Sequence, residues 1–104
     1  MKLARVRGNV VSSVKADGLS SHKLLLVEDL HPAHLGDDTD DVGSGGDPYI
    51  AVDLAGAGIS EIVVVTTGSA ARIDRGGSGV PTDAAVVGIV DSVNLDGATA
   101  YYKS

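Results

Sequence analysis

The chain has 104 residues, 14 of them acidic and 8 basic, which gives a formal net charge of −6. This length fits one domain with a modest core, and the negative charge disfavours nucleic-acid binding, which depends on Lys and Arg opposite phosphates. The absence of cysteine excludes disulfides, thiolate metal sites and cysteine nucleophiles.

The apolar residues are mostly aliphatic, since the chain has three Tyr but no Phe or Trp. A core of Val, Ile, Leu and Ala suits closely packed strands. No apolar run approaches the roughly 20 residues that span a bilayer, and the N-terminus lacks the apolar stretch of a signal peptide. We therefore expect a soluble protein that stays where it is made and has no membrane partner.

The first predicted strand covers residues 4–14, where apolar or small residues occupy most even positions. This period of two predicts a strand with its even positions buried. Gly8 falls on the predicted buried side, as expected where a barrel strand coils sharply or another backbone comes close. Asp17-Gly18 supplies turn chemistry after the strand.

Further strands are predicted in chain order at 24–27, 49–54, 61–67 and 84–93. Residues 24–27 are continuously apolar, which predicts a strand covered on both faces. The 84–93 segment has Gly88 near its centre. Residues 94–97 are predicted to form a turn, and 98–102 can pair as a short sixth strand.

Helix signals are limited to two single turns, at 69–72 and 82–85, the second preceded by Pro81. Short strands between glycine-rich turns predict an all-β fold, a small closed or partly open β-barrel with one or two short helical turns. Residues 32–47 and 73–80 are expected to be mobile loops. Within the first, residues 36–46 contain four aspartates and four glycines.

The segment Gly56–Arg72 is the most informative part of the chain. It is an apolar strand between two glycine-bearing loops, one ending in the carboxylate Glu61 and the other in Arg72. The Gly56 loop lacks the third glycine of a dinucleotide-binding turn and enters a strand instead of a helix, so we interpret it as a backbone turn.

Five ordered segments together are similar to a known family: Arg5–Val11, Lys23–Val27, Ala51–Asp53, Gly56–Arg72 and Pro81–Asp91. In this order they resemble the pentameric vertex proteins of bacterial microcompartment shells, the ethanolamine-utilization and carboxysome vertex family. The resemblance runs from about Leu3 to Val93 and lapses in the two loops. It implies one vertex domain over residues 1–104 with an oligonucleotide-binding-like barrel.

The resemblance also implies a function that is geometric and involves no reaction, catalytic residue, cofactor or metal. The expected protein is a cyclic pentamer that caps the vertices of a carboxysome or metabolosome shell in the cytoplasm. Its partners would be further copies of itself and the hexameric and trimeric shell proteins, with no nucleic acid and no membrane. The alternative is a free barrel that binds a small ligand or nucleic acid, and an enzyme ranks third.

Seven residues are expected to shape loops or assembly contacts, because they lie in the segments that carry the resemblance: Gly56, Gly58, Glu61, Gly68, Ser69, Arg72 and Asp83. Glu61 and Arg72 are either ordinary exposed charges or members of an inter-subunit or intra-loop ion pair. The family usually has glycine where this chain has Ser60. Asp53 and Asp91, each after an apolar pair, are expected to accept backbone N–H bonds.

Other candidate sites are weaker. The 37–41 aspartates do not fit a calcium loop, because Val42 stands where an oxygen ligand is needed. His31 and His34 are separated by Pro32 and an irregular segment, so they are expected to be exposed loop residues instead of metal ligands. Ser69 lies outside any nucleophile-elbow pattern, which argues against a hydrolase.

Overall fold

The computed structural model describes residues 1–13, 22–32, 47–68 and 82–103, and these contain almost no helix. The mobile loops predicted at 32–47 and 73–80 and the helical turn predicted at 69–72 fall almost wholly outside these ranges. The strands are β1 (Lys2–Val10), β2 (Lys23–Leu30), β3 (Tyr49–Asp53), β4 (Ile62–Thr67), β5 (Ala84–Ile89), β6 (Ser92–Leu95) and β7 (Ala98–Tyr102). In the described ranges no helix is long and apolar enough to cross a bilayer.

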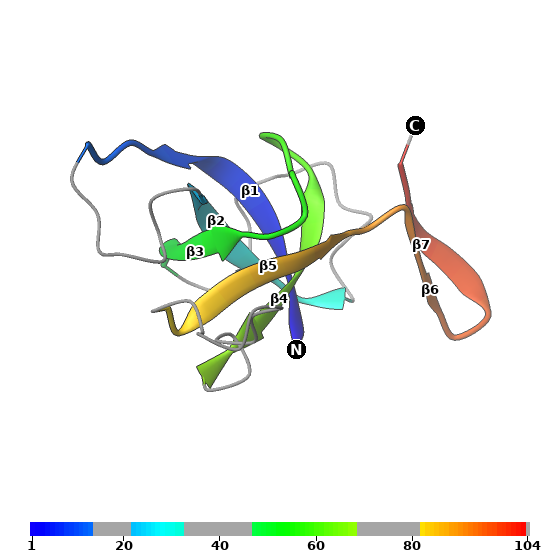
Figure 1. Ribbon diagram of the computed structural model, residues 1–104. Helices are drawn as coiled ribbons and strands as arrows, with labels where there is room; N and C mark the ends of the chain where they lie inside the picture. Colours follow the sequence, from blue (N-terminus) through cyan, green and yellow to red (C-terminus); the bar gives the residue numbers. More distant parts are fainter. Residues whose placement is uncertain (14–21, 33–46, 69–81, 104) are drawn as a thin grey trace.

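Five of the strands close a barrel in the order β1-β2-β3-β5-β4 (Figure 1). Neighbouring strands are antiparallel except β3 and β5, which run parallel. The predicted small β-barrel is therefore confirmed. The helical turn predicted at 82–85 is wrong, because β5 starts at Ala84. Instead, the Thr82 hydroxyl accepts a hydrogen bond from the N–H of Ala84 and donates one to its carbonyl. These bonds hold the backbone extended where β5 begins.

The barrel interior is filled by aliphatic side chains, since strand alternation directs every second residue inward. The buried core consists of Ala4, Val6, Leu25, Val27, Ala51, Ala57, Val63, Val65, Ala84 and Val86. All but Ala57 lie on the five barrel strands. Small and branched residues suffice because a five-stranded barrel has a narrow interior.

The alternation predicted for β1 fails after Val6. Val6 pairs with Val27 and Gly8 with Leu26, so Arg7 is an extra residue in the ladder. Such a bulge shifts the alternation by one position, which puts Gly8 on the outer side of the barrel instead of the predicted buried side. A side chain at Gly8 would meet nothing within 4 Å among the described residues, so no backbone approaches it there.

The outer wall of the barrel is partly covered. β2 was predicted to be covered on both faces, but only its inward residues Leu25 and Val27 are buried, whereas Leu24 and Leu26 are half-buried. Leu24 and Leu26 on the outer side of β2 are apolar, yet nothing in the described part of the chain buries them fully.

The strand predicted over 84–93 divides into β5 and β6. Val90 N–H bonds the carbonyl of Ile62, the first residue of β4, so the barrel offers no partner beyond this point. Asp96 and Gly97 both have positive φ, 53° and 79°, which suits a two-residue hairpin turn. β6 therefore pairs with β7, and the hairpin stands beside the barrel (Figure 1). The predicted sixth strand is confirmed, as part of this hairpin.

Candidate functional site

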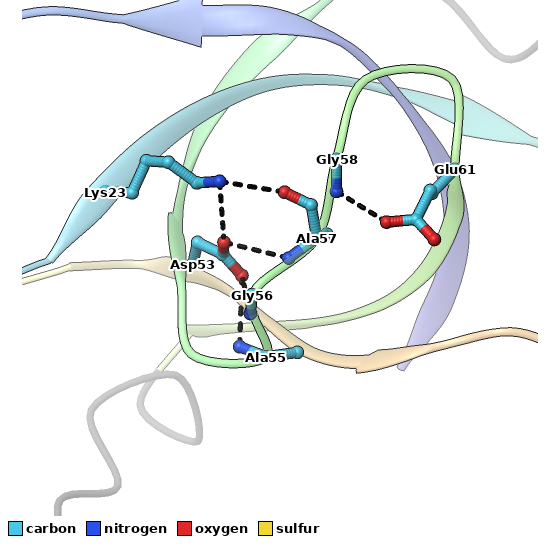
Figure 2. A network of polar contacts seen from close by, with 7 residues as sticks. All are labelled: Lys23, Asp53, Ala55, Gly56, Ala57, Gly58 and Glu61. Atoms are coloured by element: carbon cyan, nitrogen blue, oxygen red, sulfur yellow. Dashed lines mark hydrogen bonds and ion pairs between the residues drawn. The ribbon is translucent and has the colours of Figure 1, made fainter.

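A buried carboxylate organises the loop that follows β3 (Figure 2). The Asp53 side chain is 2% exposed. Its Oδ1 accepts the N–H groups of Ala55 and Gly56 at 3.0 and 2.9 Å, and its Oδ2 accepts that of Ala57 at 3.0 Å. Gly56 has φ of 80°, a left-handed conformation that glycine adopts without strain. The backbone-acceptor role predicted for Asp53 is confirmed.

Lys23, on the neighbouring strand β2, contacts the same loop, and we call Asp53 and Lys23 together the Asp53 clamp. Lys23 and Asp53 are paired in the β2–β3 register, and the Lys23 Nζ lies 3.6 Å from Asp53 Oδ2. The same ammonium donates to the carbonyl of Ala57 at 2.9 Å. Ala57 is thereby held on both backbone groups, and its methyl group closes this end of the barrel core. Sequence reasoning missed Lys23, because its role depends on a register known only from the topology.

Glu61 closes the other side of the same loop. Its Oε1 accepts the N–H of Gly58 at 2.5 Å, and its Oε2 pairs with the Nζ of Lys103 near the C-terminus. The Lys103 and Gly58 bonds hold the Glu61 pKa below its ordinary value, and the bond to Glu61 raises the pKa of Lys103. A side chain at position 58 would crowd Glu61 Oε1 at 3.3 Å, which favours glycine there.

Within the described part of the chain Glu61 forms an ion pair with Lys103, which lies outside its loop, and the inter-subunit pair stays a prediction. Lys103 comes from the segment after β7, so the pair ties the hairpin to the loop that crosses the barrel end. Lys103 N–H also bonds the carbonyl of Asp91, where the chain enters the hairpin. Asp91 thus contributes its backbone carbonyl, and its carboxylate shows no backbone bond within the described residues. Ser69 and Arg72 lie outside those residues.

The tip of the loop is anchored to β1. Ser60 N–H bonds the carbonyl of Val6 at 2.8 Å, and Val6 N–H bonds that of Glu61 at 2.9 Å. Arg5 Nη1 adds a bond to the Ser60 carbonyl at 3.0 Å. Ser60 has φ of 75°, a left-handed conformation that costs a residue with a side chain about 1 kcal/mol. Glycine would adopt this backbone conformation without strain.

Gly68 and Asp83 meet at the opposite end of β4. Gly68 has φ of 70°, and its N–H donates to the carbonyl of Asp83 at 2.9 Å. This bond joins the end of β4 to the start of β5. The sequence placed both residues among the loop-shaping candidates, and the structure brings them together through backbone groups alone.

The other end of the barrel carries a second lysine–aspartate pair. Asp29 Oδ1 accepts the Tyr49 hydroxyl at 2.6 Å, and Asp29 Oδ2 lies 2.9 Å from Lys2 Nζ. The Lys2 ammonium also lies 4.8 Å from the centre of the Tyr49 ring. Burial and the Asp29 carboxylate raise the pKa of Tyr49 well above its ordinary value. Nothing in the sequence pattern singled out this cluster, because its members are far apart in the chain.

These clusters shape the backbone and present no reactive centre. The described ranges hold no group of three or more His, Asp or Glu residues arranged around a metal position. The contacts of Asp53, Glu61 and Lys23 are with backbone groups and with opposite charges.

The chain belongs to the EutN/CcmL family: residues 1–91 match the family described as "Ethanolamine utilisation protein EutN/carboxysome". It is 44% identical over 104 residues to the carboxysome shell vertex protein CcmL of Synechocystis, covering 99% of this chain and 95% of that protein. It is 38% identical over 103 residues to the microcompartment shell vertex protein EutN of Escherichia coli, covering 99% and 100%.

Solved structures agree with this assignment. The crystal structure of E. coli EutN matches with a TM-score of 0.79 over 100% of both chains. The GrpN pentameric microcompartment shell protein of Rhodospirillum rubrum matches with a TM-score of 0.71 and 41% identity, over 91% of this chain and 98% of that chain. The resemblance seen in the sequence segments is confirmed. The relatives are vertex proteins of both carboxysomes and other microcompartments, whose shells lie in the cytoplasm.

Proposed function

We propose that this chain, as one domain over residues 1–104, forms a cyclic homopentamer that caps the vertices of a bacterial microcompartment shell. The main support for this proposal is that nearly the whole chain matches shell vertex proteins, one of which is pentameric. Hexagonal tiles alone form flat sheets or tubes, so a closed polyhedron needs fivefold units at its corners. A ring with five subunits uses heterologous contacts whose rotation closes.

The outer surface of the barrel supports assembly. Ile50, Leu54 and Val87 are 50%, 41% and 41% exposed, although each belongs to or adjoins a barrel strand. Apolar side chains exposed on a rigid wall are typical of surfaces that another protein covers. The clusters around Asp53 and Asp29 rigidify the subunit, which suits a building block of fixed shape.

The role is structural and not enzymatic. The proposal includes no cofactor and no nucleic acid, and the partners are the hexameric and trimeric shell proteins that form the facets. The net charge of −6 keeps free pentamers apart in solution until they meet a gap between facets. The alternative, a free barrel that binds a ligand, predicts a monomer.

Native mass spectrometry and shell reconstitution test the proposal. The isolated protein should have five times the 10.4 kDa mass of the chain. Co-expression of a cognate hexameric shell protein without this chain should give tubes, sheets or shells with open corners in electron micrographs. Adding this chain should close them and retain a fluorescent cargo. A monomer at micromolar concentration, or sealed polyhedra in its absence with no other vertex protein present, would contradict the proposal.

A further inference from the structure

The Glu61 carboxylate links a loop to the segment after β7, because its partner Lys103 is 42 positions away. Glu61 ends the loop that begins at the Asp53 clamp. Its Oε1 accepts the N–H of Gly58, while its Oε2 pairs with Lys103. A planar carboxylate that serves one partner with each oxygen is oriented by both partners together. If it turns away from one partner, it also loses the other.

The β6–β7 hairpin is a separate unit beside the barrel. In the described part of the chain no barrel strand pairs with β6 or β7, and the two strands form a sheet of their own (Figure 1). Lys103 N–H bonds the carbonyl of Asp91, which closes the base of the hairpin on itself. The hairpin can therefore leave the barrel wall with its internal bonds intact, by rotation of the backbone around Val90 and Asp91.

In the described ranges, apolar packing and one ion pair hold the hairpin against the barrel wall. Three partly buried side chains of the hairpin pack there: Val93, Ala100 and Tyr101. The side chains of the Lys103–Glu61 pair are 38% and 22% exposed. Segments held by partly exposed contacts open at a lower free energy than a barrel core. The hairpin should therefore open separately from the barrel, in a minor population.

The turn at residues 58–61 contains a strained residue. Glu61 N–H bonds the carbonyl of Gly58 at 3.2 Å, so residue 60 is the third residue of a tight turn. Ser60 has φ of 75° there, at a position where a type II turn favours glycine. A strained conformation persists only while surrounding contacts fix it. The bonds of Ser60 to β1 fix one side of the turn, and the Glu61 carboxylate fixes the other through the Gly58 N–H.

We propose that the β6–β7 hairpin is a strap that controls the conformation of the 58–61 turn, with the Glu61 carboxylate as the link. In the docked state Lys103 holds the carboxylate toward Gly58. When the hairpin opens, the carboxylate turns to solvent, the Gly58 N–H loses its acceptor and Ser60 relaxes. The coupling is reciprocal, so a partner that binds either element shifts the other. Ile59, 64% exposed in this turn, is the side chain that the strap positions.

Lys103→Ala tests the link from the hairpin to the turn. Residue-resolved hydrogen exchange of the full chain should show the Gly58 amide exchanging about 2–5-fold faster, the range expected for loss of a partly exposed ion pair. The hairpin amides should accelerate by a similar factor. Lys2→Ala is the matched control, because Lys2 and Asp29 form a pair of similar exposure, 41% and 30%, at the other barrel end. It should leave Gly58 and the hairpin unchanged.

Gly58→Ala tests the link in the reverse direction. A Cβ at position 58 would lie 3.3 Å from Glu61 Oε1, so it should displace the carboxylate and release Lys103. The β6 and β7 amides should then exchange about 2–5-fold faster relative to the amides of β2 and β3. Gly8→Ala is the matched control. The same methyl group at position 8 meets nothing within 4 Å among the described residues, and it should leave the hairpin unchanged.

Three results would refute the strap. An unchanged Gly58 amide in Lys103→Ala would show that the turn is fixed independently of the hairpin. A response to Lys2→Ala as large as that to Lys103→Ala, or equal acceleration of hairpin and barrel in Gly58→Ala, would show a general loss of stability. If Gly58→Ala fails to fold, the two lysine variants decide alone. None of these results bears on the pentamer, which native mass spectrometry tests separately.

Discussion

The two ends of the barrel are closed by the same pair of residue types in different ways. At one end, Asp53 is 2% exposed and accepts three backbone N–H groups besides its contact with Lys23. At the other, Asp29 is 30% exposed and binds a tyrosine hydroxyl and Lys2. The Asp53 carboxylate fixes the backbone conformation of a loop. The Asp29 carboxylate, by contrast, joins side chains that lie on strands.

This difference indicates which of the two charge pairs contributes more to the free energy of unfolding. A buried carboxylate that loses its partners, or backbone groups that lose their carboxylate, keep the full cost of desolvation. A partly exposed pair exchanges its partner for water and loses little. We therefore expect substitutions at the Asp53 end to have the larger effects.

Asp53→Ala should have the largest effect. It leaves three backbone N–H groups and the Lys23 ammonium without their acceptor, and should lower the free energy of unfolding by roughly 3–5 kcal/mol. Urea denaturation at a fixed chain concentration measures the loss. Asp53→Asn is the matched control, because its retained Oδ1 keeps two of the three bonds, and it should lose less. Equal stability of Asp53→Ala and wild type would show that the loop folds without its template.

Asp29→Ala should cost less, about 1 kcal/mol, because water can replace the carboxylate for Tyr49 and Lys2. The same urea measurement applies, and Lys2→Ala should show a still smaller loss. A loss as large as that of Asp53→Ala would contradict the contrast between the two ends.

Ser60→Gly should stabilise the protein slightly, by about 0.5 kcal/mol. Glycine relieves the positive φ at this position, and part of this gain is offset by the greater freedom of the unfolded chain. Both backbone bonds of residue 60 are retained. Ser60→Ala is the control, since it keeps the strain and should show no gain. A loss of stability in Ser60→Gly would mean that the serine side chain contributes a contact.

Because of Tyr49, the free energy of unfolding should decrease at alkaline pH. Its pKa is raised in the folded protein, so the unfolded chain ionises first and binds fewer protons. Its contribution to stability is therefore present below the ordinary tyrosine pKa of 10.0 and is lost as the pH rises above it. Tyr49→Phe should remove part of this decline, and the remainder includes Lys103, whose pKa is also raised. An unchanged decline would exclude Tyr49 as a contributor.

The Glu61–Lys103 pair should have the smallest effect, because it joins the β6–β7 hairpin to the loop after β3 and bridges no two strands of the barrel. The folded-state pKa of Glu61 lies below its ordinary value, so its contribution is present above about pH 4.5 and disappears as the pH falls through the lower value. Lys103→Ala should lower hydrogen-exchange protection in β6 and β7 without affecting the barrel. Lys103→Arg keeps the charge and serves as the control. Equal protection in all three proteins would show that the hairpin is held by packing alone.

The sequence allowed the barrel strands, the class of fold and the family to be predicted, because alternation and glycine turns are local signals. It also identified Asp53 as a backbone acceptor from its place after an apolar pair. The Arg7 bulge was not predictable, since it depends on pairing with β2. Lys23, Tyr49 and Lys103 were missed for the same reason: each acts on a residue at least 20 positions away that only the folded register brings near.

The closure of both barrel ends has a consequence for permeability. In the described part of the chain, Ala57 and Asp53 lie at one end of the barrel, Tyr49 and Asp29 lie at the other, and buried aliphatic side chains fill the interior between them. We therefore expect no diffusion path for a small solute along the axis of such a subunit. In a ring of five, any flux would pass between subunits, so substitutions inside the barrel should change stability and leave conductance unaltered.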